Sequence, residues 1–133
     1  MPCVLIIDDD KAVRSAAKIL LTANGLEVVE ASDGQSGLDA SKHRHFDLII
    51  VDLFMPGMNG LDTIKAIRSN NSDVAIIAVS GFMLAGSCPE MPGFEAMAIE
   101  AGATSTLYKP FRPKEFMRAL QKSIGLAAPA NRP

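Results

Sequence analysis

Hydrophobic and polar positions along the chain alternate between two patterns, short continuous apolar runs and apolar residues at helical spacing. Five short apolar runs are typical of strands buried in a parallel sheet, and we expect strands at residues 3–7, 26–31, 46–51, 74–79 and 105–108. Apolar residues at helical spacing follow them and predict helices over 11–24, 34–43, 60–70, 94–101 and 113–124. Strands that alternate with helices favour an α/β fold with a parallel sheet covered on both faces.

Several of these helices have recognisable ends. Gly25 is a natural stop for the first helix, and Ser32 or Asp33 supplies the side-chain oxygen that caps the second. Pro113 suits the first turn of the last helix. Arg112, which precedes it, lacks the oxygen acceptor of a usual cap, so the start of this helix needs another device.

Polar residues stand where the apolar runs end. Asp8, Asp9 and Asp10 follow the first run, Asp52 follows the third, Ser80 follows the fourth and Lys109 follows the fifth. The carboxyl ends of parallel strands meet at one edge of the sheet, where ligands bind in open α/β folds. Each residue has an ordinary explanation when taken alone, such as a helix cap for Asp9 or Asp10. Their coincidence at four strand ends favours a common site.

The residue types at this edge suit phosphate chemistry. Three carboxylates from Asp8, Asp9 and Asp52 repel one another unless a cation offsets their charge. Mg²⁺, or Mn²⁺ in its place, takes such oxygen ligands together with water and phosphate. Lys109 adds a positive charge and Ser80 a hydroxyl donor, and these are the groups that a phosphoryl transfer uses. A carboxylate can itself be the nucleophile and become an acyl phosphate.

Composition limits the class of protein. The chain has 133 residues, of which 48% are hydrophobic and 21% charged, as in an ordinary globular domain. Its formal net charge of -2 argues against a general nucleic-acid binder. The apolar runs are too short to cross a membrane, and the start lacks the basic segment of a signal peptide, so we expect a cytoplasmic protein. A disulfide between Cys3 and Cys88 is not expected there.

Four segments, in this order, carry a resemblance to a known family. They are LIIDDD (5–10), DLIIVDLFMPGMNGLD (47–62), AVSG (78–81) and YKPF (108–111). With them the chain resembles the receiver domain of response regulators, of the CheY-like kind, over about residues 3–125. The resemblance implies a doubly wound five-stranded parallel sheet of order 2-1-3-4-5, with the receiver domain at 1–125 and a short Ala/Pro tail at 126–133.

The resemblance also assigns roles to residues at the strand ends. It implies that Asp52 accepts the phosphoryl group, that Asp9 binds Mg²⁺ directly and that Asp8 binds it largely through water. Asp52 and the backbone carbonyl of Phe54 would complete the protein's share of the metal site.

Two further roles come from the resemblance. Ser80 would be the hydroxyl that moves onto the phosphoryl group, and Lys109 would pair with a phosphoryl oxygen. The peptide bond between Lys109 and Pro110 is expected to be cis.

Three features depart from the family pattern. The position three residues before the lysine, usually aromatic, is Thr106. The aromatic residue here is Tyr108, which we expect on the opposite side of its strand. The segment 82–96 is longer than usual and carries Phe82, Met83 and Met91, which suggests a partner surface. Phe54 and Phe82, each two residues beyond Asp52 and Ser80, predict slow self-dephosphorylation, because apolar groups there would exclude water.

We therefore expect a single-domain response regulator that accepts a phosphoryl group and is not an enzyme. Its only expected reactions of its own are self-phosphorylation from small donors and self-dephosphorylation. Its expected partners are a sensor histidine kinase or phosphotransfer protein and a downstream protein bound through the fourth helix, fifth strand and fifth helix. We expect a monomer or weak dimer with no direct contact to nucleic acid or membrane. His43 and His45 are too few ligands for a separate metal site.

Other functions remain open from the sequence. The chain could instead be a phosphorelay intermediate or phosphate sink, or a receiver that works without phosphorylation. A Mg²⁺-dependent aspartyl phosphatase would want a second aspartate where Phe54 stands. A flavodoxin-like FMN module would want a hydroxyl-rich loop where Asp8, Asp9 and Asp10 stand.

Overall fold

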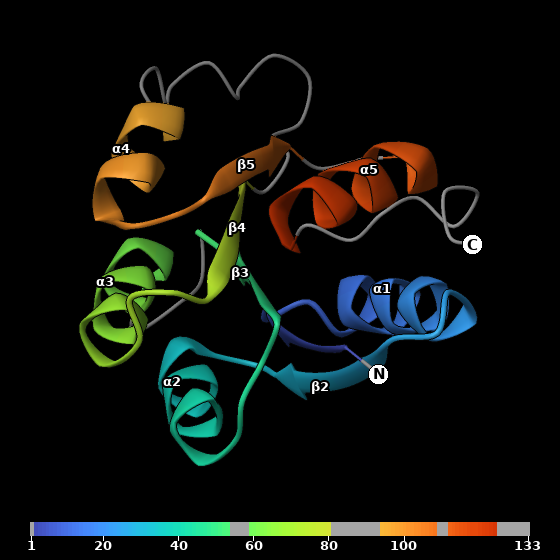
Figure 1. The fold of residues 1–133 in the computed structure, drawn as a ribbon, viewed down its shortest axis with the longest axis horizontal. Helices are drawn as coiled ribbons and strands as arrows, with labels where there is room; N and C mark the ends of the chain where they lie inside the picture. The colour runs from blue at the N-terminus through green and yellow to red at the C-terminus, as the bar shows by residue number, and fades with distance from the viewer. Residues whose placement is uncertain (1, 54–58, 81–93, 109–111, 125–133) are drawn as a thin grey trace.

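The chain folds as an alternation of strands and helices. The computed structural model describes residues 2–53, 59–80, 94–108 and 112–124. Over these ranges the strands are β1 (Cys3–Ile7), β2 (Glu27–Ala31), β3 (Leu48–Asp52), β4 (Ala75–Ser80) and β5 (Ser105–Tyr108) (Figure 1). The helices are α1 (Lys11–Ala23), α2 (Gly34–His43), α3 (Gly60–Asn70), α4 (Phe94–Ala101) and α5 (Pro113–Ile124). No helix in these ranges has the length and apolar character that a membrane span needs.

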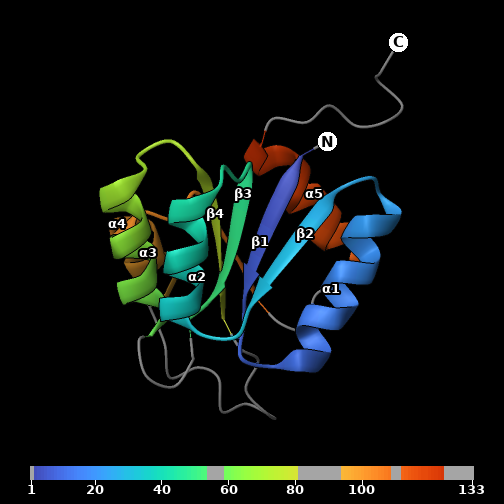
Figure 2. The same ribbon diagram turned by 90° about the horizontal axis from the view of Figure 1, so that it is seen from below.

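The five strands form one parallel sheet in the order β2-β1-β3-β4-β5, which confirms the expected fold. Helices α1 and α5 cover one face of the sheet, and α2, α3 and α4 cover the other (Figure 2). The chain leaves β1 toward β2 and returns on its other side to form β3, so the strand order reverses at β1. In open α/β sheets ligands bind at such a reversal, which here lies at the carboxyl ends of β1 and β3.

Two apolar clusters hold the helices against the sheet. Successive residues of a strand point to opposite faces, so Leu5 packs toward α2–α4 whereas Val4 packs toward α1 and α5. Phe116 and Leu120 of α5 are 1% and 0% exposed on the second face. Full burial of a side chain of this size contributes about 2 kcal/mol. The core therefore fixes the strand ends in space.

Three strands begin later than their apolar runs predict. Leu26, Phe46 and Val74 are buried, yet they precede β2, β3 and β4 by one to two residues. These side chains close the amino-end edge of the core without entering the strand ladders. The strand β3 also extends to Asp52, and β4 to Ser80, one residue beyond the predicted ends. Burial alone marks the core but not the limits of backbone pairing.

Side-chain oxygens cap three helices at the carboxyl-end edge of the sheet. The carboxylates of Asp10 and Asp33 and the amide oxygen of Asn59 accept backbone N–H bonds at the starts of α1, α2 and α3. At α5 the Glu115 carboxylate reaches back to the backbone N–H of Arg112, at 2.9 Å. This bond caps the start of α5, where the side chain of Arg112 has no oxygen acceptor.

Candidate functional site

The structure brings the polar strand ends together at one edge of the sheet. Asp8 follows β1, and Asp52 and Ser80 are the last residues of β3 and β4. Their exposed fractions are only 4%, 4% and 3%, although the residues are polar. Burial of polar groups is costly unless other groups compensate for the lost water. A buried polar set at the end of neighbouring strands indicates a site rather than a solvated surface.

Three carboxylates converge in this site. One oxygen from each of Asp8, Asp9 and Asp52 lies within 4.8 Å of the others, with Asp8 and Asp52 buried and Asp9 exposed. Oxygen ligands at this spacing, two of them buried and one open to solvent, suit a hard divalent cation that keeps several waters. The chemistry of the donor set thus fits the expected Mg²⁺ or Mn²⁺.

Local hydrogen bonds hold Asp8 in place. Its backbone N–H donates to the carbonyl of Ala31 at 3.1 Å, and its carboxylate accepts the backbone N–H of Asp10 at 2.9 Å. The Asp10 carboxylate in turn caps α1 through the N–H groups of Ala12 and Val13, at 2.9 and 3.4 Å. The third aspartate of the run is therefore the helix cap, and the first two belong to the carboxylate cluster.

The start of α3 packs directly against the backbone of Asp52. The N–H of Gly60 donates to the carbonyl of Leu53 at 3.2 Å. A Cβ atom at Gly60 would collide with the Leu53 Cα atom and the Asp52 carbonyl oxygen. The sequence predicts Gly60 only as the first residue of a helix. Its position directly after the cap residue Asn59 is the signal that points to this contact.

The pairing of the strands brings Ser80 to the same edge of the sheet as Asp52. Asp52 is in register with Val79, and the N–H of Leu53 donates to the carbonyl of Val79 at 2.9 Å. Ser80 follows directly and is in register with Tyr108. The pairing therefore brings the predicted switch hydroxyl to the same edge as Asp52.

Several predicted site residues lie outside the described ranges. They are Phe54, Phe82, Met83, Met91, Lys109 and Pro110, together with most of the segment 82–96. Their predicted roles, and the cis peptide bond before Pro110, stay predictions.

The predicted orientation of Tyr108 is wrong. Thr106 and Tyr108 are in register with Ala78 and Ser80, whereas Leu107 between them packs into the α1–α5 cluster. Residues two apart in a strand face the same side. Tyr108 therefore shares its face of the sheet with Thr106, and it stays 48% exposed.

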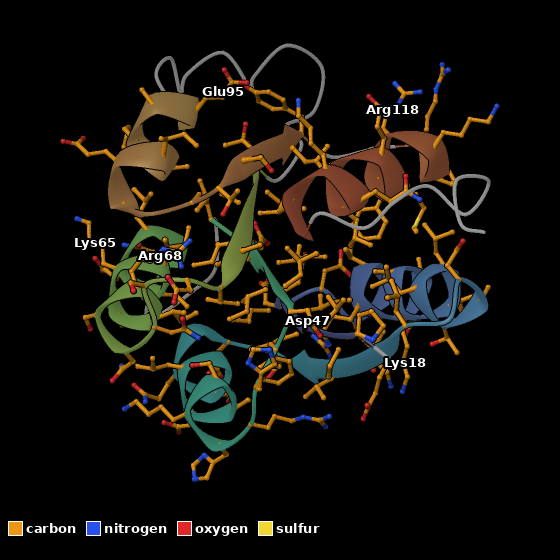
Figure 3. The ribbon with its side chains drawn as sticks, viewed as in Figure 1. Lys18, Asp47, Lys65, Arg68, Glu95 and Arg118 are labelled. Atoms are coloured by element: carbon orange, nitrogen blue, oxygen red, sulfur yellow. The ribbon has the colours of Figure 1, made fainter. Side chains whose placement is uncertain are left out.

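Apolar side chains lie exposed near this end of the sheet. Met97 and Ile99 of α4 are 42% and 49% exposed. A hollow of about 510 Å³ lies between β5 and α5, and Thr106, Leu107 and Arg118 are among its lining residues. Figure 3 labels Arg118 on α5 and Glu95 on α4.

Other candidate groups have structural roles. Nδ1 of His43 lies 2.7 Å from the backbone carbonyl of Asp39, and Nε2 of His45 lies 3.7 Å from the Asp47 carboxylate. No metal-ligating group in the described ranges includes either histidine. Cys3 is a free, buried thiol whose pKa is raised mainly by burial. Such a thiol is poorly reactive.

Sequence comparison finds relatives over nearly the whole chain. The sequence model of the response regulator receiver domain matches residues 4–121. The chemotaxis protein CheY of Thermotoga maritima is 36% identical over 123 residues, which cover 90% of this chain and 94% of CheY. The DNA-binding response regulator MtrA of Mycolicibacterium paratuberculosis is 32% identical over 121 residues, which cover 91% of this chain. This chain spans 50% of the length of MtrA.

Solved structures give the same result. The structure of the chemotaxis protein CheY4 of Vibrio cholerae aligns with a TM-score of 0.81 and 31% identity, covering 92% of this chain and 98% of CheY4. A response regulator receiver domain protein from Clostridium thermocellum aligns with a TM-score of 0.80 and 27% identity, covering 94% and 95% of the two chains.

Proposed function

Because this chain belongs to the response regulator receiver domain family, we propose that Asp52 accepts a phosphoryl group from a phosphohistidine. The donor would be a sensor histidine kinase or a phosphotransfer protein, and the transfer would need Mg²⁺. The observation that carries this proposal is the approach of the Asp8, Asp9 and Asp52 oxygens to within 4.8 Å at the carboxyl ends of β1 and β3.

The carboxylates would divide the work between metal and phosphoryl group. Asp9, which is exposed, would bind Mg²⁺ directly, and Asp8 would bind it largely through water. Asp52 and the backbone carbonyl of Phe54 would supply the remaining protein ligands. When bound, Mg²⁺ neutralises charge on the phosphoryl oxygens. With that repulsion offset, the Asp52 carboxylate becomes an effective nucleophile toward an anionic group.

The transfer is a single displacement at phosphorus. A carboxylate oxygen of Asp52 forms a bond to phosphorus while the phosphorus–nitrogen bond of the donor breaks, and the imidazole leaves with the electron pair and gains a proton. The product is an acyl phosphate on Asp52. The hydroxyl of Ser80 at the end of β4 would then donate a hydrogen bond to a phosphoryl oxygen, and Lys109 would pair with another.

The phosphorylated chain would act through a changed surface. Binding of the phosphoryl group by Ser80 would shift a two-state equilibrium that involves α4, β5 and α5. The exposed Met97, Ile99 and Tyr108 support a protein partner on this face. We propose a cytoplasmic monomer or weak dimer that binds protein rather than nucleic acid or membrane through this domain.

Intact mass spectrometry tests the phosphoryl acceptor. The chain is incubated with acetyl phosphate and Mg²⁺, next to Asp52→Asn and the control Asp39→Asn, which removes an exposed carboxylate of α2. We expect one phosphoryl adduct in the wild type and in Asp39→Asn, none in Asp52→Asn and none without Mg²⁺.

Two results would contradict the proposal. An adduct that persists in Asp52→Asn would place the acceptor elsewhere. Steady consumption of acetyl phosphate without a trapped adduct would favour an aspartyl phosphatase instead.

A further inference from the structure

Arg14 of α1 lies against the backbone of the carboxylate site. Its Nη1 atom donates to the backbone carbonyl of Asp8 at 2.7 Å. This carbonyl belongs to the peptide group that joins Asp8 to Asp9. A hydrogen bond there limits rotation of that peptide, and so it limits the direction in which the Asp9 side chain leaves the backbone.

A second bond holds Arg14 itself. Its Nε atom lies 3.1 Å from a carboxylate oxygen of Glu30 in β2. The Arg14 side chain is only 14% exposed, whereas the Glu30 side chain is 30% exposed. A guanidinium presents its donors in one rigid plane, so a bond at Nε determines where Nη1 points. Glu30 therefore orients the group that holds the Asp8 carbonyl.

The charges of this pair offset each other. The Arg14 guanidinium meets the Glu30 carboxylate, so the pair as a whole brings little net charge to the neighbouring aspartates. Lys18 also lies 3.6 Å from Glu30, but its side chain is 52% exposed and it is one turn farther along α1 (Figure 3). The contribution of Arg14 is thus expected to come from orientation rather than from charge.

We infer that Arg14, oriented by Glu30, is a positioning residue for the metal site, because it fixes the peptide group between Asp8 and Asp9. The inference rests on the proposed function, since Asp8 and Asp9 are metal ligands only there. The backbone N–H of Asp8 donates to the carbonyl of Ala31. Arg14 completes this restraint on the carbonyl side of the residue.

Binding of Mn²⁺ tests the inference without any phosphoryl transfer. The fraction of free Mn²⁺ is followed by electron paramagnetic resonance, with Mg²⁺ as competitor, on folded protein at low temperature. We expect Kd to rise about tenfold in Arg14→Gln, as for other residues that orient metal ligands. Arg14→Lys keeps the charge but cannot bridge both acceptors, so we expect the same loss.

Two further variants separate orientation from general charge. Lys18→Gln removes a positive charge beside Glu30 without touching the Asp8 carbonyl, and we expect Kd to change less than about twofold. Glu30→Gln removes the carboxylate that meets both Arg14 and Lys18, and Lys18→Gln measures the Lys18 contact separately, so we expect a loss of about threefold that does not add to that of Arg14→Gln. Thermal unfolding without metal shows which variants are folded. If Arg14→Gln does not fold, the Kd values of Glu30→Gln and Arg14→Lys test the inference in its place.

The outcomes distinguish this inference from the proposed function. Wild-type affinity in Arg14→Gln, or in Arg14→Lys, would overturn the positioning role alone. A wild-type chain that binds Mn²⁺ but accepts no phosphoryl group would overturn the proposed acceptor. The Kd values of the variants would still decide whether Arg14 positions the metal ligands. A wild-type chain that binds no divalent cation would overturn both.

Discussion

Strand β3 has an aspartate at each end, and the two carboxylates have opposite surroundings. Asp47 precedes the strand at the amino-end edge of the sheet (Figure 3), and its carboxylate accepts the backbone N–H of Cys3 at 2.8 Å. Its own N–H donates to the Cys3 carbonyl at 2.8 Å, and its side chain is 40% exposed. Asp52 ends the strand, is 4% exposed and lies among two other carboxylates.

The difference separates stability from function along one strand. Asp47 ties the start of β3 to the start of β1 with hydrogen bonds, as a structural carboxylate does. Asp52 is buried beside two other carboxylates, a set of oxygen donors that suits a divalent cation. Changes at the amino-end edge should therefore alter stability alone, and changes at the carboxyl-end edge should alter binding.

The largest contrast is expected from two glycines at the two edges. Gly60 packs against the backbone of Leu53 and Asp52, where a Cβ atom has no room. Gly25, in the turn before β2, has open space for a Cβ but a φ of +84°. We expect Gly60→Ala to lower the free energy of unfolding by about 3 kcal/mol, and Gly25→Ala by about 1 kcal/mol. Urea unfolding measures both.

The same pair also separates the effects on the site. Gly60→Ala should weaken Mn²⁺ binding, because the displaced backbone carries Asp52, whereas Gly25→Ala should leave it unchanged. Equal stability losses, or unaltered binding in Gly60→Ala, would show that the two edges do not differ in the way proposed.

The next contrast uses the metal as a probe of both edges. Mg²⁺ at 100 times its Kd should raise the free energy of unfolding by about 2.7 kcal/mol in the wild type. Asp9→Asn should lose most of this increase, because Asp9 is the expected direct ligand. Asp47→Ala should keep the full increase but start from a baseline about 1 kcal/mol lower, because the Cys3 N–H loses its acceptor.

Urea unfolding with and without Mg²⁺ gives these values, and a buffer that contains a chelator supplies the metal-free baseline. An undiminished increase in Asp9→Asn would remove Asp9 from the metal site. A lost increase in Asp47→Ala would mean that the amino-end edge also contributes to binding.

The sequence predicted the elements and the order of the sheet because both depend on strong local patterns. The apolar runs and the strand-end residues Asp8, Asp52 and Ser80 follow from periodicity and from the rules of parallel sheets. The resemblance to receiver domains supplied the strand order. The bounds of strands were less accurate, since buried residues such as Phe46 and Val74 complete the core without joining a ladder.

Contacts that depend on how the helices pack against the sheet were beyond prediction from the sequence. Arg14 reaches both the Asp8 carbonyl and Glu30 because α1 packs beside β2, and no sequence pattern marks that approach. Gly60 was recognised as a helix start, but its contact with the Asp52 backbone depends on the packing of α3. The error at Tyr108 was different, because the two-residue period of a strand already places it on the face of Thr106.

The smallest predicted effect tests whether a carboxylate's contribution to stability depends on its position at the carboxyl-end edge or on its hydrogen bonds. Asp33 follows β2 and so lies at the same edge as Asp52, yet its carboxylate accepts the backbone N–H of Ser36 at 2.7 Å. This bond lowers the pKa of Asp33 below its ordinary value of 3.8. Like Asp47, it is expected to stabilise the fold.

Because the pKa of Asp33 is lower in the folded state, its stabilising contribution is present above pH 3.8 and is lost as the pH falls through the folded pKa. Asp33→Asn keeps an oxygen acceptor for the cap but cannot titrate. We therefore expect the difference in free energy of unfolding between the wild type and Asp33→Asn to shrink between pH 5 and pH 2, because the Asp33 carboxylate becomes protonated. Urea unfolding across this range measures the difference. An advantage that grows on acidification would mean that Asp33 is destabilised by neighbouring carboxylates, so that position at the edge, rather than hydrogen bonding, governs its charge.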